Sequence, residues 1–175
     1  MGYGEDTMKI LAVSDFHGRT DTLRAVYEKV KPVDLFLHMG DCEGDESEIG
    51  SFISCRKEFV CGNCDFFCPS PEEKVIRVCG KKILLVHGHI YHVHRGLDTL
   101  RYRAAECEAD IVLFGHTHVP LIKYLDGRLF LNPGSITLPR QDGRRPTFGI
   151  LETDRNGEVL PSVWTLTGGK PVSYL

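Results

Sequence analysis

The chain has 175 residues, of which 42% are hydrophobic and 26% are charged, ordinary values for a globular protein with a substantial core. Its formal net charge of −3 and its pI of about 6.2 give no basic footprint for nucleic-acid or membrane-surface binding. The sequence has no apolar run of about 18 residues and no basic, then apolar, N-terminal segment, so we expect neither a membrane-spanning helix nor a secretory signal.

The first apolar run begins after Met8. We expect residues 1–7 to be a flexible extension or a cloning remnant, and residues 8–175 to form a single domain. Seven cysteines, an odd number, lie scattered inside apolar runs. Without an export signal, they are expected to be reduced thiols of a cytoplasmic protein and not a disulfide framework.

Eight apolar runs have the length of strands, and several are continuous, as in strands buried on both faces. They cover residues 10–13, 35–39, 59–61, 83–86, 111–114, 129–131, 148–151 and 163–166. Helical periodicity follows Thr20, a possible cap, and follows Gly96, with a weaker helix over 46–55. A hairpin is expected to turn at Cys79-Gly80. This order predicts an α/β layered domain with a mixed sheet.

Five of the predicted strands end in side chains that can bind a metal. The five blocks are Asp15-Phe16-His17, Gly40-Asp41, Gly62-Asn63-Cys64-Asp65, His87-Gly88-His89 and Gly115-His116-Thr117-His118. In layered α/β proteins, ligands bind at the carboxyl ends of strands, so we expect these side chains to form one polar cluster. The glycines permit tight turns and close approach of the backbone to that cluster.

Each block alone is a weak signal, because Gly-Asp and Gly-Asn are common turn dipeptides and a lone histidine is often only hydrogen-bonded. All five in this order are hard to explain by packing. Carboxylate, amide and imidazole donors favour Mn, Fe, Zn, Co or Ni over Ca or a cysteine-rich structural Zn. Shared between two cations, these donors leave open positions for water and phosphate, and such a pair generates hydroxide near neutral pH.

The five blocks resemble the calcineurin-like metallophosphoesterases. The short length and the strings GNCD, HGHIY and GHTHVP resemble the small stand-alone prokaryotic phosphodiesterase branch (YfcE type), and the resemblance runs from about residue 8 to about residue 152, including NPGS at 132–135. It implies a four-layer α/β/β/α sandwich with mixed sheets, the metallo-dependent phosphatase fold. It also implies a metal-dependent phosphoric ester hydrolase, by preference a phosphodiesterase, with two divalent cations: Mn first, with Zn, Fe, Ni or Co as alternatives.

The same resemblance divides the ligands between two sites. Asp15, His17 and His118 would hold the first metal, Asn63, His87 and His116 the second, and Asp41 would bridge the two. The bridging hydroxide would attack phosphorus directly, without a covalent enzyme intermediate, while the metals offset charge that develops on the phosphoryl oxygens.

The chain departs from the wider family at Cys64, where many members carry a histidine that assists the leaving group. A neutral thiol is a poor substitute, since its unperturbed pKa is about 8.5. His89 is the nearest alternative acid and, with Asn63, a candidate substrate contact; His92, His94 or water alone stay open. Asp65 is expected to orient its neighbours. A missing general acid typically costs about 10²–10⁴-fold in rate, so we expect slow turnover or a need for good leaving groups.

His38 lies inside the second predicted strand and is expected to be a core histidine, while Arg140, Arg144 and Arg145 form a basic loop that is solvated unless it folds towards the cleft. A small phosphate ester is the expected partner, and a homo-oligomer stays open. Three functions compete: a phosphodiesterase, a phosphomonoesterase with the same site, and a non-catalytic protein-binding scaffold like the retromer subunit of this fold. The complete set of ligand positions favours an enzyme.

Overall fold

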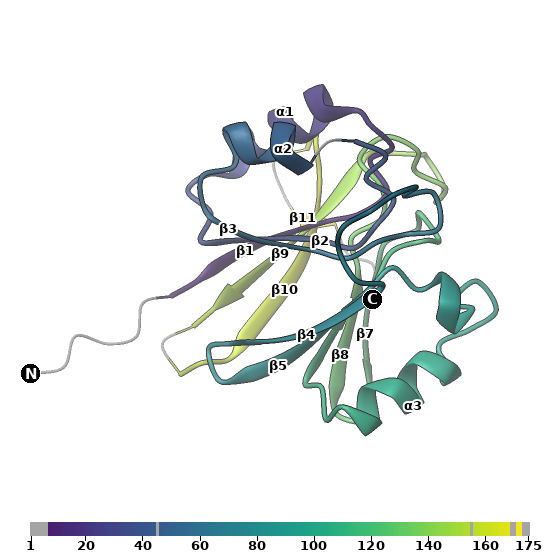
Figure 1. Cartoon of the computed structure of the whole chain (residues 1–175). Helices are drawn as coiled ribbons and strands as arrows, with labels where there is room; N and C mark the ends of the chain where they lie inside the picture. The colour runs from purple at the N-terminus through teal and green to yellow at the C-terminus, as the bar shows by residue number, and fades with distance from the viewer. Residues whose placement is uncertain (1–6, 45, 155, 169–170, 173–175) are drawn as a thin grey trace, which may run out of the picture.

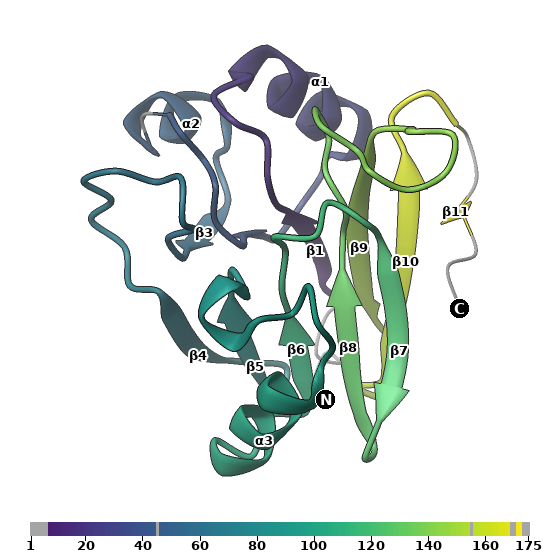
Figure 2. The same ribbon diagram turned by 90° about the vertical axis from the view of Figure 1, so that its right-hand side faces the viewer.

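The computed structural model describes residues 7–44, 46–154, 156–168 and 171–172. The extension expected at residues 1–7 therefore lies, except for Thr7, outside the described residues. Within the described part, the chain builds two mixed sheets that face each other (Figures 1 and 2). None of the helices described there has the length and hydropathy to span a membrane.

The first sheet has the strand order β11-β10-β9-β1-β2-β3. Its strands are β1 (Lys9–Val13), β2 (Leu35–His38), β3 (Arg56–Phe59), β9 (Thr147–Thr153), β10 (Val159–Thr165) and β11 (Pro171–Val172). β1, β2 and β3 run parallel, and β9 joins β1 in antiparallel register. Parallel strands need crossover connections, and the helices that follow β1 and β2 supply them.

The second sheet has the order β4-β5-β6-β8-β7. It consists of β4 (Glu73–Val78), β5 (Lys81–Val86), β6 (Ile111–Leu113), β7 (Leu121–Leu125) and β8 (Arg128–Asn132). β4 and β5 form the hairpin expected at Cys79-Gly80, while β5, β6 and β8 are parallel. The carboxyl ends of β5 and β6 thereby reach the same edge of the sheet.

Helices cover the outer faces of both sheets, which makes four layers. α1 (Thr20–Val30) and α2 (Glu46–Phe52) lie over the first sheet, and α3 (Asp98–Glu106), preceded by the short 3₁₀ helix η1 (His89–Tyr91), lies over the second (Figure 2). Alternate residues of each central strand face inward and outward. In β1, Ile10 and Ala12 join the core between the sheets, whereas Leu11 and Val13 pack under the helices.

This arrangement confirms the predicted α/β/β/α sandwich, with three local corrections. The third predicted strand, at 59–61, is displaced to 56–59, because the strand begins with three charged residues that give no apolar run. Thr20 is the first residue of α1 and caps nothing; Arg19 occupies the cap position without a side-chain hydrogen bond. β7 lies in a stretch for which no strand was predicted, since its exposed and half-buried residues break the apolar run.

Candidate metal centre

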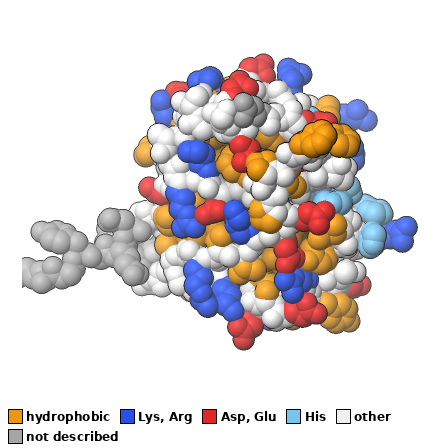
Figure 3. Space-filling model, in the orientation of Figure 1, with side chains coloured by type: hydrophobic (Ala, Val, Ile, Leu, Met, Phe, Trp, Pro, Cys, Tyr) orange, Lys and Arg blue, Asp and Glu red, His pale blue; other side chains and the backbone are white. Residues whose placement is uncertain are grey.

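The loops after β1, β2, β3, β5 and β6 converge at one edge of the sandwich. They bring together all seven side chains predicted as metal ligands: Asp15, His17, Asp41, Asn63, His87, His116 and His118. Figure 3 shows that histidine side chains gather at one place on the edge of the molecule. The spatial convergence predicted from the strand ends is therefore present.

The first group consists of Asp15, His17, Asp41 and His118, whose ligand atoms all lie within 4.8 Å of one another. His118 Nε2 is 3.2 Å from Asp15 Oδ1 and 3.4 Å from His17 Nε2. Asp41 Oδ2 lies 4.0 Å from His17 Nε2. Two carboxylates and two imidazoles thus surround one point, as four ligands of a single cation would.

The second group surrounds His87 Nε2. Asn63 Oδ1 lies 3.1 Å from this nitrogen, His116 Nδ1 lies 3.3 Å from it, and Asp41 Oδ2 lies 3.4 Å from it. Asp41 Oδ2 therefore borders both groups, which is the position that a bridging carboxylate needs.

Contacts on the outer side of the His118 and His17 imidazoles fix which of their nitrogens faces the centre. His118 Nδ1 donates to the Leu138 carbonyl at 2.7 Å, and His17 Nδ1 lies 2.5 Å from Glu43 Oε2. Metal-bound histidines commonly use their second nitrogen in this way. In the neutral tautomer that donates from Nδ1, each ring turns an unprotonated Nε2 towards the centre, and the two Nε2 atoms lie 3.4 Å apart.

A buried oxygen beside these nitrogens points to the same conclusion. Asp15 is fully buried, and its Oδ1 has no hydrogen-bond partner among the described residues. Unpaired buried acceptors are costly, and facing lone pairs repel. A cation between them would remove both costs, so the residues present fit a bound metal.

The backbone is bent sharply to make this approach possible. Asp15, His17, Asp41, His116 and His118 all have positive φ values, between 47° and 67°. Non-glycine residues seldom adopt this conformation, and it is concentrated at functional sites. Glycine is required beside them: a Cβ on Gly62 would lie 2.1 Å from Asp41 Oδ1, and one on Gly115 would lie 1.9 Å from Ser14 Oγ.

The carboxylates favour positive charge at the centre. Burial alone would lower the pKa of His87, but Asp41 and Asp15 outweigh it and raise that pKa. Burial alone would likewise raise the pKa of Asp41, but His87 and the hydrogen bonds from Cys64 outweigh it, so the net pKa lies below the ordinary value. Asp41 is thus ionised at neutral pH, as a metal ligand must be.

Cys64 and His89 border the centre without joining either group. Burial and the neighbouring Asp41 raise the pKa of Cys64 to about 11, so its thiol stays neutral near pH 7. Burial and the charge on His87 lower the pKa of His89, whose ring centroid lies 5.4 Å from that of His87. Neither group is a strong proton donor at neutral pH.

Asp65 holds two ligand loops together. Its carboxylate accepts hydrogen bonds from the backbone N–H groups of Asp41, Gly62 and Glu43, each at 2.8 Å. These contacts occupy both oxygens with backbone donors, which suits the orienting role that the sequence suggested. The sequence also offers Asp65, beside His89, as a candidate catalytic residue, and these contacts give that role no support.

The remaining histidines lie where the sequence placed them. His38 is buried among Phe16, Phe36 and Phe59, and burial lowers its pKa to about 4, so it is a core histidine. His92 and His94 are exposed on the loop before α3.

Two supporting contacts were missed from the sequence. Glu43 contacts His17, and the 132–135 turn, to which no chemistry was assigned, anchors the ligand loops: Ser135 Oγ donates to the Asp15 carbonyl at 2.7 Å. Metal-bound histidines often form a hydrogen bond to a carboxylate. This rule would have drawn attention to acidic residues of the ligand loops, among them Glu43.

The expectation that all cysteines are reduced is wrong for one pair. Cys61 and Cys68 form a disulfide across the loop that carries Asn63, with their Cα atoms 6.0 Å apart. The bonds to Asp65 fold this loop back on itself and bring its two ends within disulfide distance. The other five cysteines are not disulfide-bonded.

Comparison with known proteins extends over most of the chain. Residues 8–156 match the calcineurin-like phosphoesterase superfamily domain. The chain is 37% identical over 156 residues to YsnB, a probable metallophosphoesterase of Bacillus subtilis. The alignment covers 87% of this chain and 89% of that protein. The chain is also 29% identical over 104 residues to the phosphodiesterase YfcE of Escherichia coli, in an alignment that covers 54% of this chain and 52% of that protein.

Solved structures give the same assignment. A predicted phosphoesterase of Streptococcus pneumoniae TIGR4 superposes with a TM-score of 0.77 at 32% identity, covering 92% of this chain and 99% of that one. Vps29 of Entamoeba histolytica in complex with zinc superposes with a TM-score of 0.73 at 28% identity, covering 94% and 96%. The chain therefore belongs to the calcineurin-like phosphoesterase superfamily, whose members are metal-dependent.

Proposed function

We propose that this chain hydrolyses phosphodiesters with two divalent cations, through direct attack of hydroxide on phosphorus. The observation that carries the proposal is the position of Asp41 Oδ2, 4.0 Å from His17 Nε2 and 3.4 Å from His87 Nε2. One carboxylate that borders two donor groups is what a pair of cations requires. Asp15, His17 and His118 complete one group; Asn63, His87 and His116 complete the other.

When bound, such a pair supplies hydroxide near neutral pH and neutralises the phosphoryl oxygens. The mixed oxygen and nitrogen donors suit Mn²⁺, with Zn, Fe, Ni or Co as alternatives. The protein holds the donors ionised and orients them: Asp65 fixes the Asp41 loop, and Leu138 and Glu43 fix two imidazoles. This order in the donor shell limits reorganisation when charge develops on phosphorus.

Protonation of the leaving group is the weak part of this site. The Cys64 thiol has a pKa of about 11, and the pKa of His89 is lowered, so neither gives up a proton readily at neutral pH. Departure of the alcohol then depends on its own acidity. We therefore expect faster turnover of aryl esters than of alkyl esters.

Two recesses beside the centre support a diester over a monoester. One, of about 510 Å³, is lined by Glu43 and Cys64, and the other, of about 430 Å³, by His94 and His116. A diester carries two organic substituents that leave phosphorus in different directions. Each recess offers a place for one of them, whereas a monoester would use only one.

A protein-binding scaffold is the second candidate, because the chain superposes on Vps29 and carries two exposed phenylalanines, Phe66 and Phe67. Scaffolding alone does not require Asp15 Oδ1 to be buried without a partner, nor two imidazole lone pairs to face each other. The donor arrangement therefore favours the enzyme.

The test is hydrolysis of bis(p-nitrophenyl) phosphate against p-nitrophenyl phosphate, with added Mn²⁺ and with chelator. We expect diester turnover that disappears with chelator, returns with Mn²⁺, and falls in Asp41→Asn to the level of the chelated protein. Metal analysis of the active protein should give two ions per chain. Asp142→Asn, at an exposed carboxylate on another loop, is the matched control and should retain activity. Absence of turnover of either ester with Mn, Zn, Fe, Ni and Co would refute the proposal.

A further inference from the structure

Two adjacent phenylalanines stand almost fully in solvent beside the metal centre. Phe66 is 84% exposed and Phe67 is 104% exposed. Single exposed apolar side chains are common, but a pair of large ones next to a candidate active site points to a binding surface. What needs explaining is what these two rings contact.

The loop that carries the rings is held in place and is not a free tip. The Cys61–Cys68 disulfide closes it. Within it, Asp65 accepts hydrogen bonds from three backbone N–H groups, and the Cys64 N–H donates to Asp41 Oδ1 at 2.9 Å. A constrained backbone loses little further entropy when the rings that it carries bind a ligand.

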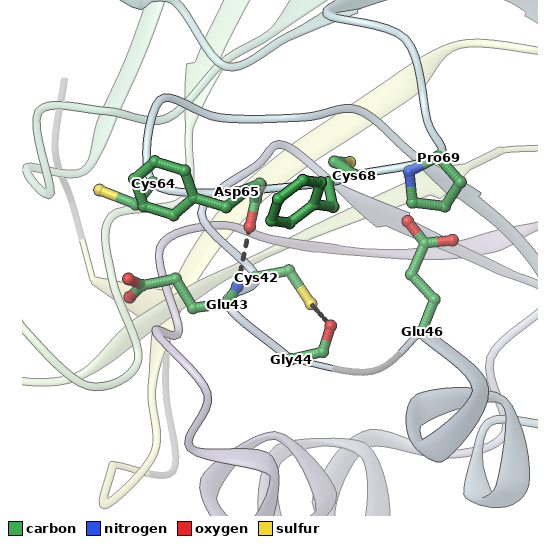
Figure 4. Close-up of a pocket in the computed structure, with 10 residues that line it drawn as sticks. Cys42, Glu43, Gly44, Glu46, Cys64, Asp65, Cys68 and Pro69 are labelled. Atoms are coloured by element: carbon green, nitrogen blue, oxygen red, sulfur yellow. Dashed lines mark hydrogen bonds between the residues drawn. The ribbon is translucent and has the colours of Figure 1, made fainter.

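The rings line a groove that adjoins the metal centre through Glu43 and Cys64. This groove, of about 510 Å³, is bordered by Phe66, Phe67, Cys64 and Glu43. Figure 4 shows Glu43 and Cys64 at one end of it and Glu46 and Pro69 at the other. Glu43 contacts the His17 ring, so a substituent on a phosphate at the centre can enter the groove directly.

The lining selects the chemistry of the occupant. Glu43, Glu46 and Asp65 place carboxylates along the groove, which disfavours a second phosphate there. Phenylalanine rings bind planar aromatic groups through stacking, and they do so with little dependence on which base is present. A nucleobase on its sugar is a neutral planar group that a phosphodiester can carry at this distance from phosphorus.

We propose that Phe66 and Phe67 form an aromatic platform that binds the nucleobase of a nucleotide-like phosphodiester substrate. This inference rests on the proposed phosphodiesterase function and names its substrate class. Stacking on one aromatic side chain is worth about tenfold or more in affinity, so loss of both rings should be clearly measurable.

The kinetic test uses two diesters with the same leaving group: the p-nitrophenyl ester of thymidine 5′-phosphate and methyl p-nitrophenyl phosphate. In Phe66→Ala/Phe67→Ala we expect KM for the nucleotide ester to rise about tenfold or more, with kcat and the methyl ester unchanged. Phe66→Tyr/Phe67→Tyr should restore the wild-type KM. Tyr102→Ala, which removes an exposed aromatic ring from α3, is the matched control and should change neither substrate.

A binding measurement separates failure of this inference from failure of the proposed function. Titration of Mn²⁺-loaded protein with thymidine 5′-phosphate should give a Kd that is about tenfold higher in the double alanine variant, even if no ester is hydrolysed. Equal changes for both diesters, or an unchanged KM and an unchanged Kd, would overturn the platform. In the latter case the rings would be free to serve a protein partner.

Discussion

The two sides of the metal centre differ in charge and in surface. On the Cys64 side, the groove is acidic and aromatic, with Glu43, Phe66 and Phe67 along it. On the His118 side, a recess of about 560 Å³ is lined by residues of the 137–144 loop, including Arg140 and Arg144. A phosphate ester at the centre is thus bordered by carboxylates on one side and guanidinium groups on the other.

Both sides are anchored to the ligand loops. Asp65 ties the acidic groove to the Asp41 loop, and the basic recess is tied to His118 by the Leu138 carbonyl and by the Arg140 N–H, which donates to the His118 carbonyl at 3.1 Å. Contrasting charge on two anchored loops orients an asymmetric ligand. We infer that a neutral aromatic substituent points towards the groove and any further anion towards the recess.

The largest expected effect is a gain of function at the groove side. Cys64→His places an imidazole beside Asp41, whereas the wild-type thiol has a pKa of about 11. A general acid contributes about 10²–10⁴-fold, so diesters with poor alkyl leaving groups should gain about 10²-fold, and nitrophenyl diesters much less. The measurement is kcat/KM against leaving-group pKa. Cys64→Ala should show no gain, and a uniform change across all leaving groups would exclude general-acid rescue.

Metal affinity should depend on Asp65, which anchors the acidic groove, more than on Asp142, an acidic residue of the loop that forms the basic recess. Asp65→Asn keeps the shape of the side chain but replaces one carboxylate oxygen with an NH₂ group. Because NH₂ donates and cannot accept, the hydrogen bond from the backbone N–H of Asp41 or Glu43 is lost. Loss of such an orienting contact typically costs about 10–100-fold in metal affinity, to be measured as the Kd for Mn²⁺. Asp142→Asn on the recess loop is the control. Equal losses in the two variants would mean that total charge, and not orientation, sets affinity.

The fold was predictable where strands are buried on both faces. In β1 and β5, one set of residues packs between the sheets and the other under the helices, so both strands read as continuous apolar runs. Edge strands lack that constraint. Lys123 interrupts the apolar residues of β7, and β3 begins with three charged residues, so neither strand was placed correctly from periodicity.

The candidate site was predictable to a similar depth. Asp15, Asp41 and His87 follow strand ends, and the parallel order of those strands fixes where they meet. Glu43 and the Cys61–Cys68 disulfide depend on how a loop returns in space, which no local pattern encodes. The same holds for the opposite charges on the two sides of the centre.

The smallest effect expected is selective and lies at the basic recess. Arg140 lines both this recess and the one beside His116, and no hydrogen bond or ion pair of its guanidinium occurs within the described residues. A charge-assisted hydrogen bond to a second phosphate is worth about 1.5–3 kcal/mol, less where solvent and salt screen it, so Arg140→Ala should lower kcat/KM about tenfold for a dinucleotide with a terminal phosphate.

The same dinucleotide without that phosphate should be hydrolysed by Arg140→Ala at the wild-type rate, and Arg145→Ala, outside the recess lining, should match the wild type on both. The Arg140 and Phe66/Phe67 variants remove contacts to different ends of one substrate. Their effects on kcat/KM should therefore multiply, because contacts without shared partners are additive in free energy. A combined effect clearly smaller than the product would mean that the groove and the recess bind the same substituent, and the assigned orientation of the substrate would be wrong.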